Sequence, residues 1–155
     1  LRPPDARVRA FVQRVSSASV AVDDELISRI GPGMLVLLGV AVDDTRSEAE
    51  WMARKLRALR IFDDVDGRMN EPLGDREVLC VSQFTLLGEV AKGNRPSWGR
   101  AAPGEVAQPL YETVCALLGA EQGVFGAHME VDLVNDGPVT LLIESPGGSG
   151  SLNEG

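Results

Sequence analysis

The sequence predicts an α+β fold, with a curved, barrel-like, largely antiparallel or mixed β-sheet and two main helices packed on it. Three observations support this prediction. Strand-like and helix-like segments follow in the order strands, helix, strands, helix, strands, which is not the strict alternation of a doubly wound parallel fold. The length of 155 residues suits one domain with a substantial core. No internal repeat or linker divides the sequence.

The first third of the chain predicts a meander of strands joined by short turns. Residues 8–15 and 18–22 are rich in apolar and β-branched residues, and residues 26–30 form the expected return strand after an acidic turn. The segment MLVLLGV at 34–40 is continuously apolar, as in a strand that is buried on both faces. These segments therefore predict the first strands of the sheet.

Two helices are predicted. Thr45 followed by Glu48 fits a capping box, in which each side chain accepts a hydrogen bond from the backbone of the other residue. The apolar stripe that follows, with a Lys stem at its margin, consists of Trp51, Met52, Lys55, Leu56 and Leu59. The second helix is expected over 109–119, with Pro109 in its first turn and Gly119 at its end.

The second half of the chain predicts further strands around a long loop. Residues 77–87 begin as a buried strand, and the Gly- and Pro-marked segment 88–105 has the length of a functional loop. Residues 123–134 predict one or two strands, and residues 139–144 predict the last one. A Gly-Pro pair stands directly before that last strand. Because proline has no N–H for a sheet ladder, this pair predicts an abrupt corner.

The domain is expected to span residues 8–145. Residues 1–7 are interpreted as an N-terminal extension or an added remnant, and they show no secretory signal. Residues 146–155 are rich in Gly and Ser and are expected to form a flexible tail. No apolar run approaches the roughly 20 residues of a membrane span, so no membrane partner is expected.

Composition argues against several classes of function. The chain has two cysteines and one histidine, whereas a structural zinc site takes about four such ligands, so no metal or cofactor is expected. Cys80 and Cys115 stand in apolar segments and are expected to be buried, reduced thiols. The net charge of −8 argues against broad binding to nucleic acid, which depends on neutralising many phosphates. It remains compatible with a narrow contact to one end of a nucleic acid.

The hydrolase motifs GxSxG, HExxH and GxxxxGK[ST] are absent from the sequence. His128 stands at an alternating strand position, where a solvated residue is more common than a catalytic base. Ser82 and Gln83 interrupt an apolar strand just before Phe84 and Thr85. Polar groups in a buried strand need partners. The two residues either satisfy neighbouring backbone groups or form a site, and the residues alone leave both readings open.

The expected loop holds the densest positive charge of this acidic chain. Lys92, Arg95 and Arg100 lie near Trp98 in the sequence. Such a group can bind a phosphate or stack on a base. Surface Lys and Arg more often serve only solubility, so a solvated loop is the alternative.

Two short signatures appear in order and intact: SQFT at 82–85 and N-x-G-P-x-T at 135–140. The segments that accompany them are VRAFVQRVSSASVAVDDELISRIGPGMLVLLGV, LRIFDDVDGRMN, VSQFTLLGEVAKGNRPSW, PLYETV and MEVDLVNDGPVTLLIE. Together they resemble the D-aminoacyl-tRNA deacylases of the classical bacterial and eukaryotic type. The resemblance runs from about Val8 to Ser145, over the whole expected domain.

The resemblance implies a cytoplasmic, homodimeric hydrolase that acts in chiral proofreading during translation. Its substrate would be the 3′ CCA end of a tRNA that carries a D-amino acid or, by mischarging, glycine, and it would need no cofactor. The cationic loop residues Lys92, Arg95 and Arg100 would attract the tRNA locally. The alternative is a non-catalytic nucleic-acid-binding dimer, against which the net charge of −8 counts.

The resemblance also implies that the first signature is catalytic. Ser82 and Gln83 would position the ester carbonyl. In one mechanism Thr85 is a nucleophile, which requires an adjacent base. In the other, the 2′-hydroxyl of the terminal ribose helps to activate water while backbone N–H groups of Phe84 and Thr85 hold the oxyanion. The motif contains no histidine or lysine, so the second mechanism is favoured.

The second signature is implied to be a chiral filter. Gly137–Pro138 of one subunit, with a cis peptide bond, would enter the pocket of the other, with Asn135 and Thr140 beside it. A rigid main-chain wall suits this task because rejection of an L-amino acid requires a clash. Arg9 and Met129 are expected to support the site, Arg9 by bonding a carbonyl near the Gly-Pro pair.

Overall fold

The computed structural model describes residues 7–146, so the expected extension at 1–7 and tail at 146–155 lie almost wholly outside the described residues. The elements in chain order are β1 (Arg9–Val22), β2 (Glu25–Ile30), β3 (Gly33–Gly39), α1 (Arg46–Ala58), β4 (Phe62–Asp63), β5 (Met69–Glu71), β6 (Glu77–Ser82), the 3-10 helix η1 (Phe84–Leu87), α2 (Gly104–Leu118), β7 (Glu121–Gln122) and β8 (Glu130–Glu144).

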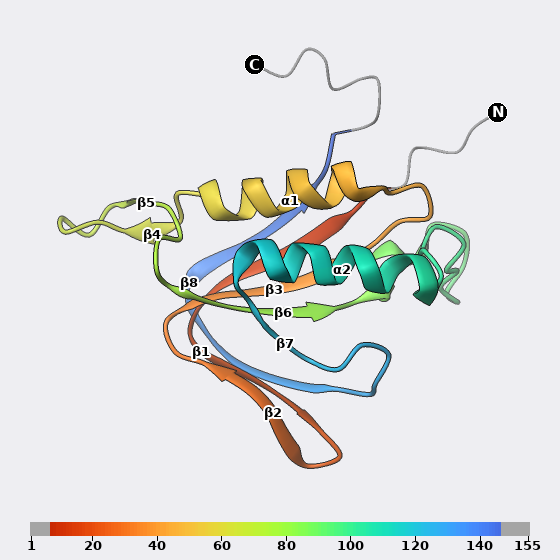
Figure 1. Cartoon of the computed structure of the whole chain (residues 1–155), viewed down its shortest axis with the longest axis horizontal. Helices are drawn as coiled ribbons and strands as arrows, with labels where there is room; N and C mark the ends of the chain where they lie inside the picture. The colour runs from red at the N-terminus through yellow and green to blue at the C-terminus, as the bar shows by residue number, and fades with distance from the viewer. Residues whose placement is uncertain (1–6, 147–155) are drawn as a thin grey trace.

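Six strands form one curved mixed sheet around the long strand β1 (Figure 1). β1 pairs antiparallel with β8 along most of its length, and its other edge pairs antiparallel with β3 and then with β2. β3 lies parallel to β6, and β6 lies parallel to β7. The hydroxyl of Ser28 on β2 donates to the carbonyl of Gln122 on β7 at 2.5 Å, so the sheet curls toward itself. The predicted α+β fold with a barrel-like mixed sheet is confirmed.

Two pairs of predicted strands are single long strands in the structure. The segments 8–15 and 18–22 both belong to β1, because register shifts near Arg14 let the pairing with β8 continue through the break. β8 begins at Glu130 and runs through the expected corner. Gln13 pairs with residue 140 and Val15 with residue 135, so residues 136–139 stand opposite Arg14 alone. The Gly-Pro corner is therefore a bulge inside a strand.

The helices α1 and α2 lie side by side over one face of the sheet (Figure 1). The capping box of Thr45 and Glu48 is formed as predicted. α2 begins directly after Pro103, so Pro109 lies inside the helix and its predicted place in the first turn is wrong. Pro103 stands directly before the helix as its N-cap, in an extended conformation. Gly119 ends α2 in the left-handed conformation at φ 63°, as predicted.

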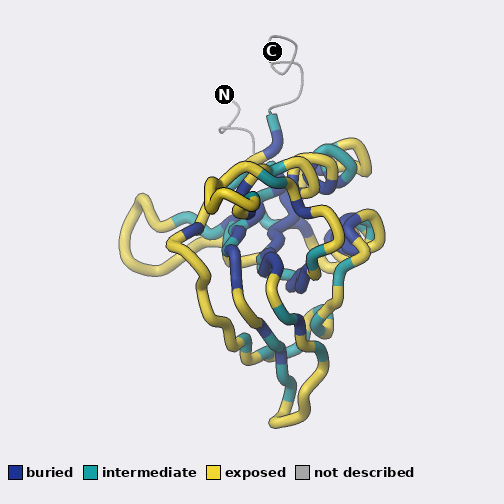
Figure 2. Tube along the Cα trace, turned by 90° about the vertical axis from the view of Figure 1, so that its left-hand side faces the viewer, coloured by how far each residue is buried: buried dark blue, intermediate teal, exposed yellow. Residues whose placement is uncertain are grey.

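The main core lies between the helices and the sheet, where Figure 2 shows the chain as buried. Met52 of α1 and Val114 of α2 are fully covered. The hydroxyl of Tyr111 donates to the carbonyl of Cys80 at 2.7 Å and so fastens α2 to β6. Cys80 and Cys115 are buried free cysteines, as predicted.

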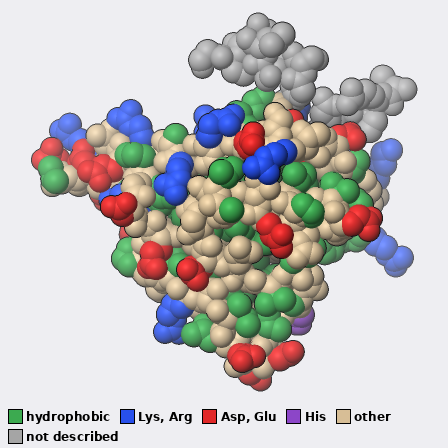
Figure 3. Space-filling model, in the orientation of Figure 1, with side chains coloured by type: hydrophobic (Ala, Val, Ile, Leu, Met, Phe, Trp, Pro, Cys, Tyr) green, Lys and Arg blue, Asp and Glu red, His purple; other side chains and the backbone are tan. Residues whose placement is uncertain are grey.

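Charge is unevenly distributed over the surface. In the view of Figure 3, acidic side chains gather at the tip of the β1–β2 hairpin, where Asp23, Asp24 and Glu25 are exposed. Basic side chains lie along α1 in the same view. None of the helices between residues 7 and 146 is long and apolar enough to cross a membrane.

Candidate active site

The first signature lies where β6 ends. After the half-buried Ser82 the backbone turns at Gln83, whose N–H donates to a carbonyl of β3 at 2.8 Å. The strand predicted over 77–87 therefore ends at Ser82, and η1 follows it. Leu87 is 1% exposed and packs on Gly39, where a Cβ would lie 2.6 Å from its Cδ2 atom. This close approach folds the end of the signature back against the sheet, which an apolar run in the sequence cannot reveal.

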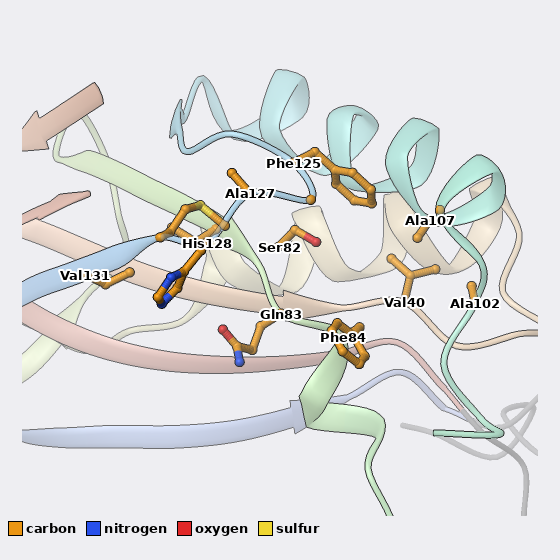
Figure 4. A pocket seen from close by; sticks show the side chains of 14 residues that line it. Val40, Ser82, Gln83, Phe84, Ala102, Ala107, Phe125, Ala127, His128 and Val131 are labelled. Carbon is orange, nitrogen blue, oxygen red and sulfur yellow. The ribbon is translucent and has the colours of Figure 1, made fainter. Parts of the chain in front are cut away.

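A cavity of about 440 Å³ lies beside this turn (Figure 4). Three of the four predicted catalytic residues, Ser82, Gln83 and Phe84, line it, and so does the predicted supporting residue Met129. Thr85 does not line it. The rest of the wall is mostly apolar and consists of Val40, Val81, Ala102, Gly104, Ala107, Phe125, Gly126, Ala127, His128 and Val131.

Two side chains near the cavity bear on nucleophilic catalysis. The hydroxyl of Thr85 is exposed and accepts a hydrogen bond from the amide of Gln83. His128 lines the cavity together with Ser82, because residues 123–129 form an irregular segment and not the predicted strand. Among the hydrogen bonds of residues 7–146, none joins His128 to a hydroxyl of the signature. Within these residues, the site therefore lacks the hydrogen bond between a hydroxyl and a histidine that defines a serine or threonine triad.

Metal chemistry finds no support in the described part of the chain. No group of three or more His, Cys, Asp or Glu side chains between residues 7 and 146 is placed to hold an ion.

The second signature forms the bulge of β8. The peptide bond between Gly137 and Pro138 is cis. The amide of Asn135 donates to the carbonyl of Val139 at 3.1 Å and to that of Arg14 at 3.0 Å, so it spans the bulge. A Cβ on Gly137 would lie 2.1 Å from the backbone nitrogen of Val139. The bulge therefore requires glycine at this position.

Arg14 fixes the same bulge, and sequence reasoning missed it. Its side chain is 10% exposed; Nε donates to the carbonyl of Asp136 at 2.8 Å and Nη1 to that of Ile61 at 2.8 Å. Its guanidinium also lies 3.3 Å from the carboxylate of Asp63. The signal was available, since Arg14 occupies an inward-facing position in the alternation of β1.

Arg9 does not bond near Gly137–Pro138 of its own chain. Its Nη1 donates to the carbonyl of Leu86 at 2.7 Å, and its Nε bonds Glu144 at 2.5 Å. The register explains the difference, because Arg9 pairs with Glu144 at the far end of β8 from the bulge. Within one chain, Arg9 supports η1, and the expected bond to a carbonyl near the Gly-Pro pair is not formed there.

Gly137 and Pro138 are exposed and do not line the cavity of their own chain. Thr140 lies behind them on the strand, where its hydroxyl accepts a hydrogen bond from the amide of Gln13 at 3.2 Å. The entry of the pair into the cavity of a second subunit stays a prediction.

The loop between η1 and α2 is paired at its base. Glu89 and Ser97 exchange two backbone hydrogen bonds of 2.9 and 3.0 Å, and Arg100 forms an ion pair with Glu89 at 2.7 Å. Lys92 and Arg95 lie in the exposed stretch between the paired residues. Of the three predicted cationic contacts, Arg100 thus stabilises the loop, while Lys92 and Arg95 face solvent.

A buried carboxyl supports another wall of the cavity. Asp44 is 8% exposed and accepts a hydrogen bond from the N–H of Ala41 at 2.7 Å. Burial raises the pKa of Asp44 from its ordinary value of 3.8 to about 6. The turn that it holds begins at Ala41, directly after Val40, whose carbonyl accepts a hydrogen bond from the N–H of Ala102 at 2.9 Å. Both Val40 and Ala102 line the cavity.

Comparison with known proteins gives consistent results. Residues 11–144 match the family described as D-Tyr-tRNA(Tyr) deacylase. A D-aminoacyl-tRNA deacylase of Opitutus terrae is 56% identical over 146 residues, which cover 89% of this chain and 97% of the relative. A D-aminoacyl-tRNA deacylase of Dechloromonas aromatica is 53% identical, with 89% and 97% covered.

Two solved structures are also similar to this one. The c-Myc DNA Unwinding Element Binding Protein superposes with a TM-score of 0.84 at 44% identity, covering 90% of this chain and 99% of the other. A probable eukaryotic D-amino acid tRNA deacylase gives a TM-score of 0.76 at 17% identity, with 88% and 98% covered. The second likeness concerns the fold alone.

Proposed function

The chain belongs to the D-Tyr-tRNA(Tyr) deacylase family and hydrolyses D-aminoacyl-tRNA, and we propose that it does so as a cytoplasmic homodimer that proofreads chirality in translation and also cleaves glycyl-tRNA. The observation that supports the site assignment most is the cavity beside η1. It is polar along the first signature and mostly apolar elsewhere, as in sites that hold a small group through a few placed polar contacts.

The proposed reaction is the attack of water on the ester carbonyl, which gives a tetrahedral oxyanion. The first N–H groups of η1, those of Phe84 and Thr85, have no partner inside that helix and would hold the oxyanion. The 2′-hydroxyl of the terminal ribose would help to orient and activate the water. A nucleophilic Thr85 is the less supported alternative, because its hydroxyl bonds an amide rather than a base.

The proposed chiral filter is the β8 bulge of a second subunit. Gly137–Pro138 is exposed, is anchored by Asn135 and Arg14, and presents main chain without an intervening side chain at Gly137. Main-chain carbonyls suit the ammonium of the substrate and would reject the side chain of an L-amino acid by steric clash.

Dimer formation is supported by the surface of β8. Within residues 7–146 this strand pairs only with β1, which leaves its other edge open along 15 residues. Apolar side chains are exposed along it, namely Leu133, Val134, Leu141 and Leu142, with between 37% and 58% of their surface accessible. A long open edge with apolar side chains favours association with another chain. We propose that a second copy covers this edge and that the bulge enters the cavity of the other subunit.

The tRNA contact is proposed for the exposed cations of the loop between η1 and α2. Lys92 and Arg95 can attract phosphates of the 3′ end although the chain as a whole carries a net negative charge. Such a contact is narrow, so it agrees with the net charge of −8.

The decisive experiment compares deacylation of D-tyrosyl-tRNA, L-tyrosyl-tRNA and glycyl-tRNA by the wild type and by Gly137→Ala. The wild type should cleave the D-ester and the glycyl ester and spare the L-ester. Gly137→Ala should lose D-cleavage or its chiral discrimination, because the added Cβ must displace Val139. Gly31→Ala is the matched control, since its Cβ would meet only the end of a Glu77 side chain at 3.4 Å. Equal cleavage of both enantiomers by the wild type would contradict the proposed specificity.

A second candidate is a nucleic-acid-binding dimer without catalysis. It is favoured by the likeness to a protein named for binding a DNA unwinding element. The net charge of −8 counts against it. Tight binding of DNA at physiological salt, together with no deacylation of any of the three substrates, would establish this candidate instead.

A further inference from the structure

Two large aromatic side chains stand exposed at the edge of the cavity. We propose that Phe84 and Trp98 form a stacking platform for the unpaired base that precedes the terminal adenosine of the substrate's 3′ end. This inference rests on the proposed function and adds to it the position of a second nucleotide.

The exposure of the pair is the first observation. Phe84 is 53% exposed and Trp98 is 43% exposed, although large aromatic side chains are usually well covered. Their ring centroids lie 5.2 Å apart with an angle of 71° between the planes. The edge-to-face contact uses only part of each ring, so aromatic surface remains accessible to a ligand.

The tryptophan is also held in place, which lowers the entropic cost of binding. Its ring packs on Gly88, where a Cβ would lie 2.6 Å from its Cζ3 atom. Its carbonyl accepts from the N–H of Ala101 at 3.0 Å. The paired residues Glu89 and Ser97 close the loop just before it.

The position of the aromatic pair beside the cavity, and the cations on the same loop, indicate which ligand it binds. Phe84 lines the cavity and contacts Trp98, so the platform adjoins the cavity that would take the last nucleotide. Lys92 and Arg95 are exposed on the same loop, and the nearby Glu89 is already paired with Arg100. Flat aromatic surface beside cations is the chemistry that binds single-stranded nucleic acid without sequence preference. The CCA end of tRNA is such a strand.

The test uses three D-tyrosyl esters of increasing length: adenosine, the trinucleotide CCA and the full tRNA. Trp98→Ala should raise KM for the trinucleotide and tRNA esters roughly five- to a hundredfold, the range that loss of a stacking side chain gives. It should leave kcat for all three, and KM for the adenosine ester, unchanged. Trp98→Phe should restore most of the affinity. Val90→Ala is the control, because Val90 is an exposed apolar residue of the same loop.

A direct measurement makes the test independent of hydrolysis and of the folding of the Trp98 variants. Trp51→Phe leaves Trp98 as the only tryptophan of the chain. Its fluorescence should then be quenched by the free trinucleotide CCA and far less by adenosine.

Four outcomes would overturn the platform: no quenching by CCA, an equal effect of Trp98→Ala on all three esters, no effect on any, or a change of oligomeric state in Trp98→Ala. The last would assign the aromatic pair to an interface between copies. A wild type that cleaves no ester would instead refute the proposed function. The quenching of Trp98 fluorescence by CCA would still show whether the aromatic pair binds the trinucleotide.

Discussion

Replacement of Arg14 by methionine tests how the β8 bulge is held. Methionine retains much of the apolar stem but removes the donors to the carbonyls of Asp136 and Ile61. A hydrogen bond to a charged group contributes about 1.5–3 kcal/mol, and two of them are lost. Relief of the desolvation cost of a buried guanidinium offsets part of that loss. We therefore expect the free energy of unfolding to fall by about 2–4 kcal/mol, which lowers Tm by roughly 5–15 °C in a domain of this size.

The assay is urea unfolding followed by tryptophan fluorescence and by circular dichroism, whose transitions should coincide. Arg54→Met is the matched control, because Arg54 is exposed on α1 and its loss should cost less than about 0.5 kcal/mol. Arg14→Met should also lose cleavage of D-tyrosyl-tRNA under conditions in which it is fully folded, since the bulge loses its anchor. A loss of stability below about 0.5 kcal/mol would refute this account of the bulge.

Three further predictions concern other groups. Thr85→Ala should keep measurable deacylation in a single-turnover assay, because the proposed mechanism uses the backbone of Thr85 and not its hydroxyl. The double variant Lys92→Glu and Arg95→Glu should raise KM for charged tRNA and flatten the dependence of KM on salt concentration. Asp44→Asn should change the pH dependence of unfolding. Because burial raises the pKa of Asp44, its stabilising contribution is complete below pH 3.8 and is lost as the pH rises through about 6. The wild type should therefore lose stability relative to Asp44→Asn across that range.

Each of these has an outcome that contradicts it. A trapped acyl ester on Thr85 would make the hydroxyl the nucleophile. If the dependence of KM on salt concentration were unchanged in the double variant, the loop would be a solvated loop without a tRNA contact. If the free energy of unfolding depended on pH in the same way in the wild type and in Asp44→Asn, burial would not raise the pKa of Asp44.

Most of the fold could be predicted because it depends on local patterns. The apolar run of β3, the capping box at Thr45 and the C-terminal signal at Gly119 all act within a few residues. The bulge of β8 could not be predicted in this way. Four residues face Arg14 alone because β1 and β8 pair with each other, and that register is fixed by contacts between distant segments.

The candidate site was predicted only in part, because some of it also depends on contacts between distant segments. The polar break drew attention to SQFT and the resemblance implied that it is catalytic, yet its turn into η1 depends on the close packing of Leu87 on Gly39. The opposite wall, with His128, comes from a segment some 40 residues away that folds over the cavity. Arg14 looks like one more charged residue until the inward alternation of β1 is considered.

The pairing of β1 with β8 has a consequence for how the chain folds. These strands hold residues from opposite ends of the described chain, so their contacts have a large sequence separation. Closing so long a loop costs chain entropy before the strand pairing can stabilise it. Topologies of high contact order therefore fold slowly. During synthesis, β1 must wait with one edge open until residues 130–144 have been made. Unpaired strand edges make incompletely folded chains prone to aggregation, so this edge is a site of aggregation throughout that wait.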